Sequence, residues 1–113
     1  MNENSILSSV KKLLGLTVED KSFDTDIIIH INAALATLHQ LGVGPKDGFC
    51  ITDDASTWQD FVGNNLPLIG MLRTYVYLKV RLVFDPPTSS FVVESIKQNI
   101  SEYEWRINSA VDY

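Results

Sequence analysis

The residues of this chain best suited to catalysis or metal binding are two histidines, a single cysteine and two pairs of aspartates. His30 and His39 stand nine residues apart in a segment with helical spacing. At about 100° per residue, this separation places them on opposite faces of a helix. A metal site needs ligands that converge on one point, so the two histidines do not form one on their own. Cys50 stands between Phe49 and Ile51, a setting typical of a small buried hydrophobic residue.

The aspartate pairs are Asp24 with Asp26 and Asp53 with Asp54. General acid–base catalysis needs carboxyl groups whose environments push their pKa values apart. Both pairs lie beside expected helix starts, where aspartate caps free amides and complements the helix dipole. The glycines of residues 42–48 lack the Gly-Lys-Ser/Thr end of a phosphate-binding loop, and the chain has no Gly-x-Ser-x-Gly motif. We therefore expect no enzymatic activity, no catalytic residue, no metal ion and no cofactor.

The charge distribution argues against tight DNA binding. The net charge is −5, and residues 17–60 carry eight acidic residues against two lysines. Affinity for DNA comes mainly from lysine and arginine on phosphates. The densest basic group is Arg73, Lys79 and Arg81. Its two arginines lie about 80° apart around a helix, so a solvent-exposed face or a subunit contact fits better than a DNA-reading helix.

Length and composition indicate one globular domain. The chain has 113 residues, of which 45% are hydrophobic and 20% charged. A lone cysteine cannot form an internal disulfide, which favours a reducing cytosol. We expect no signal peptide, because the first residues lack a basic segment followed by a long apolar run. The uncharged stretch 61–72 is too short to cross a bilayer, so we expect no membrane span.

Apolar spacing predicts the elements that must position these residues. Four segments have apolar residues at intervals of three and four, which indicates helices over about 6–14, 24–41, 66–84 and 90–107. We expect Asp24 to cap the second of these helices and Asp53 or Asp54 to cap a brief helix that holds Trp58. The third helix is rich in β-branched and aromatic residues, which leaves a strand as the alternative, but its length favours a helix.

The expected fold class is all-α. We predict a small bundle of about four helices with one Gly/Pro-rich loop, residues 42–55, between the second and third main helices. The stripes of these two helices, which include Leu35 and Val76, should form the core. We expect residues 1–106 to form the single domain and residues 107–113 to form a C-terminal tail.

Several stretches together carry a family pattern. They are residues 6–15, 23–35, 41–49 with Thr57-Trp58, 75–87 with Ser89-Ser90-Phe91, and Glu104-Trp105-Arg106. The pattern covers nearly the whole chain in order and resembles the head-tail connector (adaptor, head completion) proteins of siphophages and of prophages in Gram-positive bacteria. Its motifs are structural and include no catalytic signature.

The resemblance implies a structural virion protein at the head-tail interface, assembled in the host bacterial cytoplasm. Connectors of this kind form a homo-oligomeric ring of about twelve subunits below the portal protein, built from heterologous contacts that close by rotation. The ring extends the DNA channel, and it offers a docking platform for a stopper or tail-joining protein. Duplex DNA would pass through the lumen without sequence-specific binding, because an acidic wall repels phosphate. The alternative is a small helical interaction or regulatory module of a prophage. A regulatory module that binds DNA would require a basic recognition helix, and this chain lacks one.

Three groups of residues are candidates for contacts with these partners. Apolar residues near the C-terminus are candidates for the portal interface: Trp105, Ile107, Val111 and Tyr113. Candidates for the interface between subunits are Trp58, Arg73, Arg81 and Asp85. Candidates for a loop contact are Val43, Pro45, Lys46 and Phe49. For Trp58 and Trp105, core packing is the default interpretation and an interface hot spot is the alternative.

Overall fold

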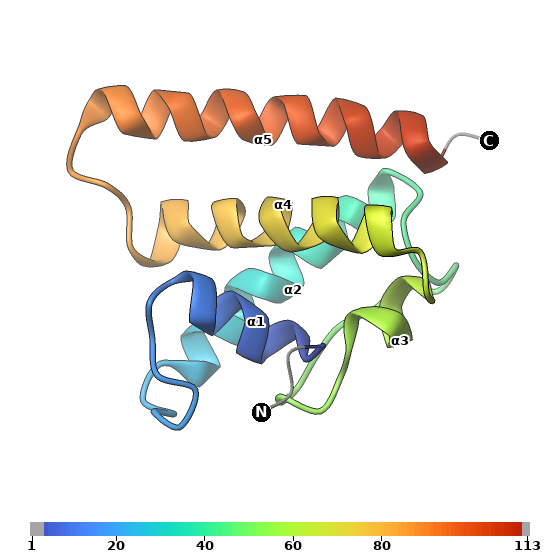
Figure 1. Cartoon of the computed structure of the whole chain (residues 1–113), viewed down its shortest axis with the longest axis horizontal. Coiled ribbons are helices and arrows are strands. Elements are labelled where there is room, and N and C mark those ends of the chain that lie inside the picture. Colours follow the sequence, from blue (N-terminus) through green and yellow to red (C-terminus); the bar gives the residue numbers. More distant parts are fainter. Residues whose placement is uncertain (1–3, 112–113) are drawn as a thin grey trace.

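The computed structural model describes residues 4–111, and this part of the chain is all-helical (Figure 1). Its helices are α1 (Ile6–Leu13), α2 (Asp24–Gln40), α3 (Trp58–Val62), α4 (Leu66–Phe84) and α5 (Ser90–Val111). The predicted helical bundle is confirmed, and the strand alternative for residues 66–84 is wrong. The only extended pairing within the described residues is an isolated bridge between Ser5 and Thr57.

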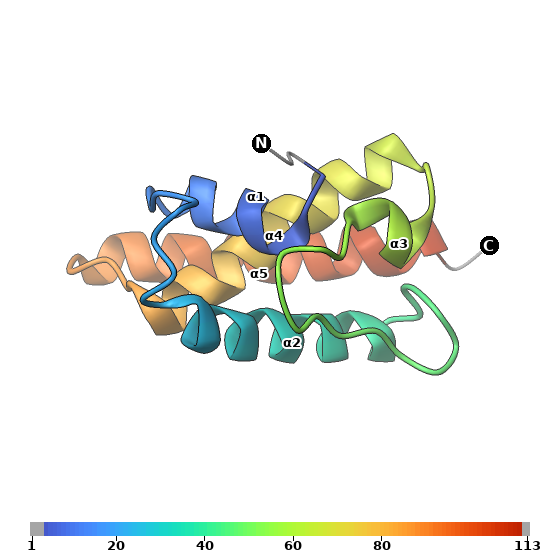
Figure 2. The same ribbon diagram turned by 90° about the horizontal axis from the view of Figure 1, so that it is seen from below.

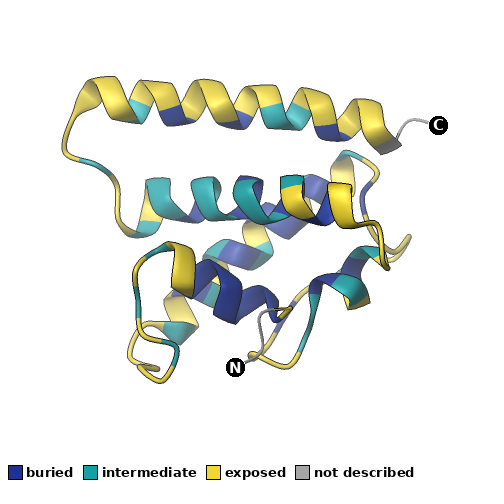
Figure 3. Ribbon diagram, viewed as in Figure 1, coloured by how far each residue is buried: buried dark blue, intermediate teal, exposed yellow. Residues whose placement is uncertain are grey.

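Helix α4 is the centre of the bundle. It packs against α1, α2, α3 and α5. Figures 1 and 2 show α2 and α5 on different sides of α4, with α5 running back along it after the turn at residues 85–89. The stripes of α2 and α4 both contribute fully buried side chains, including Leu35 and Val76. These two helices therefore form most of the core, as the sequence predicts, and Figure 3 shows their inner faces as buried.

Polar caps fix where most of the helices begin. Ser5 caps α1 by accepting a hydrogen bond from the Ser8 amide, and Asn65 caps α4 in the same way through the Leu68 amide. Thr57 and Asp60 form a reciprocal capping box at the start of α3. The expected cap of α3 by Asp53 or Asp54 is therefore wrong. Those aspartates come too early in the chain to reach the first free amides of that helix.

The start of α2 also differs from the prediction. Phe23 occupies the N-cap position and makes no side-chain cap, whereas Asp24 is the first helical residue. The Asp24 carboxylate is instead engaged by the ammonium group of Lys11, at 2.7 Å. Asp24 stands one position too late in the chain to act as the N-cap, and its ion pair with the buried lysine holds the carboxylate toward α1.

The loop that precedes α3 has no regular structure, yet one side chain anchors it. Asn32 of α2 donates to the Ile51 carbonyl oxygen at 3.0 Å and accepts from the Ile51 amide at 2.8 Å. This pair of bonds holds Ile51 in the core. Cys50 consequently points outward and is exposed, so its predicted burial is wrong.

The C-terminal helix is longer than the sequence suggested. Helix α5 continues to Val111, and Ile107 is fully buried in the core. The expected tail therefore does not begin at residue 107, because Ile107 still belongs to the apolar stripe of α5 that packs in the core. Tyr113 lies outside the described residues.

Candidate interaction surfaces

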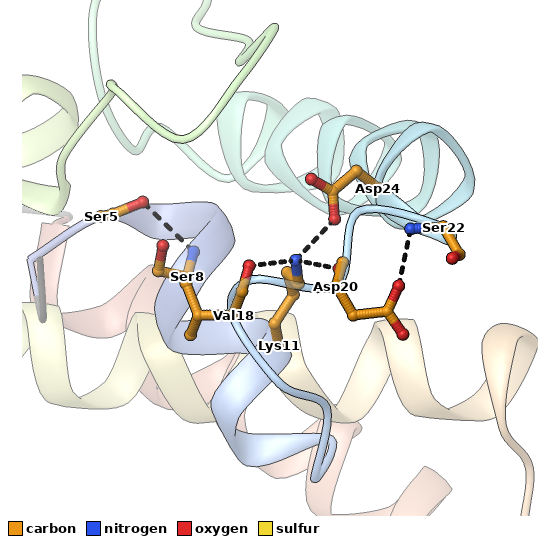
Figure 4. A network of polar contacts seen from close by, with 7 residues as sticks. All are labelled: Ser5, Ser8, Lys11, Val18, Asp20, Ser22 and Asp24. Atoms are coloured by element: carbon orange, nitrogen blue, oxygen red, sulfur yellow. Dashed lines mark hydrogen bonds and ion pairs between the residues drawn. The ribbon is translucent and has the colours of Figure 1, made fainter. Parts of the chain in front are cut away.

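The buried ammonium group of Lys11 joins three segments of the chain through polar contacts (Figure 4). Only 2% of this side chain is exposed. Its Nζ donates to the carbonyl oxygens of Val18 and Asp20, at 2.9 and 2.7 Å, and lies 2.7 Å from the Asp24 carboxylate. All three donors of the ammonium group are therefore engaged. Lys11 ties α1 to the linker and to the start of α2, which is a structural role.

The linker beyond Lys11 is held by a second, local interaction. The Asp20 carboxylate accepts a hydrogen bond from the Ser22 amide at 3.0 Å, as Figure 4 shows. Hydrogen bonds from the side chain and the amide of Ser22 lower the pKa of Asp20. The carboxylate is thus stabilised by its own turn, which accounts for it without a catalytic function.

A second buried polar contact joins α4 to α5. The Tyr75 hydroxyl, in a fully buried side chain, donates to the Glu104 carboxylate at 2.8 Å. Burial raises the pKa of Tyr75, and the adjacent Glu104 charge raises it further. A neutral tyrosine is therefore part of the packing between these two helices.

This contact should make stability fall at alkaline pH. The raised pKa of Tyr75 means that the folded state resists losing the proton, whereas an unfolded tyrosine loses it near pH 10. The contribution of Tyr75 is present below pH of about 10 and is lost as the pH rises above it. Urea unfolding at a series of pH values should show this fall, and Tyr75→Phe should reduce it. If Tyr75→Phe follows the parent curve while Tyr103→Phe flattens it, the coupling is misassigned.

Potential metal ligands do not converge anywhere in the described part of the chain. Within residues 4–111, no group of three or more histidine, cysteine, aspartate or glutamate side chains could hold a metal ion. His30 is half-buried and His39 exposed on α2. No helix among the described residues is long and apolar enough to cross a membrane.

Three of the predicted contact residues are enclosed in the core. Trp58 is fully buried and donates through Nε1 to the Ser9 hydroxyl at 2.9 Å. Val43 and Ile107 are buried as well. A side chain that is already enclosed cannot anchor a partner without local unfolding. We therefore no longer count these three residues as candidates for an interface. The capping box of Thr57 and Asp60 fixes where α3 begins, and the spacing of Trp58 and Phe61 on one side of that helix was the sequence signal for burial.

The other candidates lie at the surface in two regions. Pro45 and Lys46 are exposed in the loop, while Phe49 is half-buried and packs on the ring of Phe61, with centroids 5.1 Å apart. Arg73 and Arg81 are half-exposed on α4, and Asp85 follows that helix.

The outward side of α5 carries two large exposed aromatic residues. Trp105 is 72% exposed and Phe91 is 81% exposed. They stand fourteen residues apart, about 21 Å along the helix, and both face away from the stripe that carries Ile96 and Ile100. Figure 3 shows this outward side as almost continuously exposed. Sequence reasoning missed Phe91, because it stands next to the expected helix cap.

These features define a small helical subunit whose distinctive groups lie on its outer surfaces rather than in a converging polar site. The chain belongs to the phage connector protein family, whose family model matches residues 6–113. The predicted family is therefore confirmed. No curated protein and no solved structure gives a significant match.

Proposed function

We propose that this protein is the head-tail connector of a long-tailed phage or prophage. It would form a ring of about twelve subunits below the portal protein, with heterologous contacts that close by rotation. The ring would extend the DNA channel and present a platform for the stopper or tail-joining protein. The observation that carries this proposal is the match to the connector family over residues 6–113.

The outward side of α5 supports a contact with a partner protein. Exposed tryptophan is enriched among the residues that dominate binding energy. Trp105 lies near the C-terminal end of α5, on a side that no other helix covers. We assign the portal contact to Trp105 together with the end of the chain, which includes Val111 and Tyr113. The loop residues Pro45, Lys46 and Phe49 would form a second contact at the other side of the ring.

The acidic character of the chain supports passage of DNA without tight binding. The net charge is −5, and α2 has two aspartates and no lysine or arginine. A lumen lined with negative charge repels phosphate and keeps DNA mobile. We propose assembly in the host bacterial cytoplasm and a final place at the head-tail interface of the virion.

The proposal predicts a loss of tail joining when the α5 contact is removed. Trp105→Ala should keep the helical circular dichroism and the melting temperature, because the side chain is exposed. It should lower co-sedimentation with portal-bearing heads by roughly thirtyfold, which corresponds to a hot-spot loss of about 2 kcal/mol. The affected lysate should then contain heads without tails.

The matched control is Phe91→Ala, which removes the other exposed aromatic residue of α5. It should leave the binding to heads near the parent level. Equal binding by Trp105→Ala and the parent would place the portal contact elsewhere. A parent protein that does not co-sediment with portal-bearing heads at all would overturn the proposed function itself.

A further inference from the structure

Helix α4 has one face, opposite its buried stripe, whose residues are exposed or half-exposed. The face consists of residues at intervals of three and four: Gly70, Thr74, Tyr77 and Arg81. We call it the open face of α4. Thr74 and Val76 lie about 160° apart around the helix, and Val76 is fully buried in the core. The open face therefore points away from the core.

The open face carries Arg81, and Arg73 lies at its edge, in an otherwise acidic protein. Helix α4 has three basic residues and no acidic one, but Lys79 lies on another side, with its ammonium group 5.9 Å from the centre of the Tyr75 ring, and Asp85 follows the helix. Arg81 donates through Nη1 to the Tyr77 hydroxyl at 2.9 Å. The Nε atoms of Arg73 and Arg81 are both buried, and neither finds an acceptor among residues 4–111. Both arginine residues are half-exposed, and each guanidinium group has further N–H donors that an acceptor from outside the subunit can reach.

The complementary charge lies on the opposite side of the molecule. Residues 17–60 carry eight acidic residues and two lysines, a net charge of 2 − 8 = −6. The outer side of α2 consists of exposed residues at helical spacing: Asp26, Ile29 and Ala33. The Asp24 charge is taken by Lys11, whereas Asp26 is exposed at the surface. The outer side of α2 therefore presents one exposed carboxylate, one exposed apolar residue and one small residue.

The open face of α4 and the outer side of α2 also lie at the same level along the bundle. The rings of Phe23 and Phe84 lie 5.5 Å apart, which places the start of α2 beside the end of α4. Asp26 and Arg81 are therefore at the same end of the bundle and on opposite sides of it. A contact between the open face of one copy and the outer side of α2 in the next copy is heterologous. Because the two surfaces lie at the same level along the bundle, the contact relates neighbouring copies by a rotation with little translation along the rotation axis. Contacts of that kind close into rings.

We propose that the open face of α4 binds the outer side of α2 in a second copy of this chain. Asp26 of the second copy pairs with Arg81, and the two helices run antiparallel, so that Ala33 of the second copy lies against Thr74. The inference deepens the proposed function, because it names the contact that would build the ring.

Disulfide cross-linking tests this geometry directly. The variant combines Ala33→Cys and Thr74→Cys with Cys50→Ser, so that no other thiol remains. The protein is oxidised on portal-bearing heads and, in parallel, as concentrated free protein. We expect a ladder of dimers, trimers and higher species from the double-cysteine variant. Each single-cysteine variant should stay monomeric, since a heterologous contact never brings the same residue of two copies together.

Charge exchange provides a second test. Arg81→Asp should lower the cross-linked fraction roughly tenfold or more, because it sets like charges against each other. Adding Asp26→Arg to that variant should restore the ladder. The control Lys97→Asp makes the same change of charge at an exposed lysine of α5 and should leave the ladder intact. Circular dichroism verifies that each variant is folded.

The failures of the two proposals are distinguishable. A double-cysteine variant that binds heads at the parent level without forming a ladder overturns this contact and leaves the connector function standing. Dimers from a single-cysteine variant show a two-fold contact and also overturn it. Absence of binding to heads, together with a ladder in free protein, refutes the connector function and supports the contact.

Discussion

Lys11→Met should lower the free energy of unfolding by roughly 3–5 kcal/mol, the range for removing one partner of a buried ion pair. Methionine fills a similar volume but donates no hydrogen bond. The variant leaves the Asp24 carboxylate without its cation and the carbonyl oxygens of Val18 and Asp20 without their donor. Urea unfolding followed by circular dichroism measures the change.

The matched control is Lys21→Met, which alters an exposed lysine of the same linker. A surface change of this kind should stay within about 0.5 kcal/mol. Adding Asp24→Leu to Lys11→Met should recover part of the loss, because it removes the orphaned charge. Equal unfolding midpoints for Lys11→Met and Lys21→Met would show that the network contributes nothing to stability.

The helices themselves were predictable from the sequence, because their apolar stripes are long. The expected bounds of the third main helix, 66–84, match those of α4. Asn65 and Pro67 mark its start, and Pro86 and Pro87 stop it. Gly15 and Gly42 follow α1 and α2 with positive φ angles, as expected for glycines just beyond a helix end.

The role of Lys11 was not predictable in the same way. Two of its acceptors are backbone carbonyl oxygens in a linker, and any sequence provides such groups. Lys11 and Lys12 are the same residue type in adjacent positions, yet the first is buried and the second exposed. The apolar stripe of α1 lies closer to Lys11 than to Lys12, but the acceptors of Lys11 depend on the path of the linker, which is set by tertiary packing.

The sequence predicted only in part which side chains lie at the surface, as the two tryptophans illustrate. Trp58 is enclosed and Trp105 is exposed, although both stand in helices that contribute buried apolar residues to the core. The burial of Ile107 did have a signal, since it continues the spacing of Ile96 and Ile100. Removing the chain after Arg106 would therefore delete a core residue. A truncation that tests the C-terminal end should retain Ile107, because loss of folding would otherwise mimic loss of binding.

The other large effect on stability is expected from substitutions in the core that α2 and α4 form. Leu35→Ala and Val76→Ala should each lower the free energy of unfolding by roughly 2–5 kcal/mol, the range for large-to-small changes in packed cores. Both side chains are fully buried. Each deletion removes apolar contacts and leaves a cavity that helices on several sides of α4 hold open. Thermal and urea unfolding of the purified variants measure both losses.

The control for Val76→Ala is Val83→Ala, the same chemical change in the same helix at a side chain that is 60% exposed. It removes the same atoms without opening a cavity, so it should alter stability by no more than about 0.5 kcal/mol. The difference between the two variants then isolates burial from helix propensity, because alanine improves propensity equally at both positions. If Leu35→Ala and Val76→Ala both unfold like the parent, α2 and α4 do not pack through these stripes. The open face of α4 and the outer side of α2 would then be misplaced as well, because both are defined as the sides opposite the core.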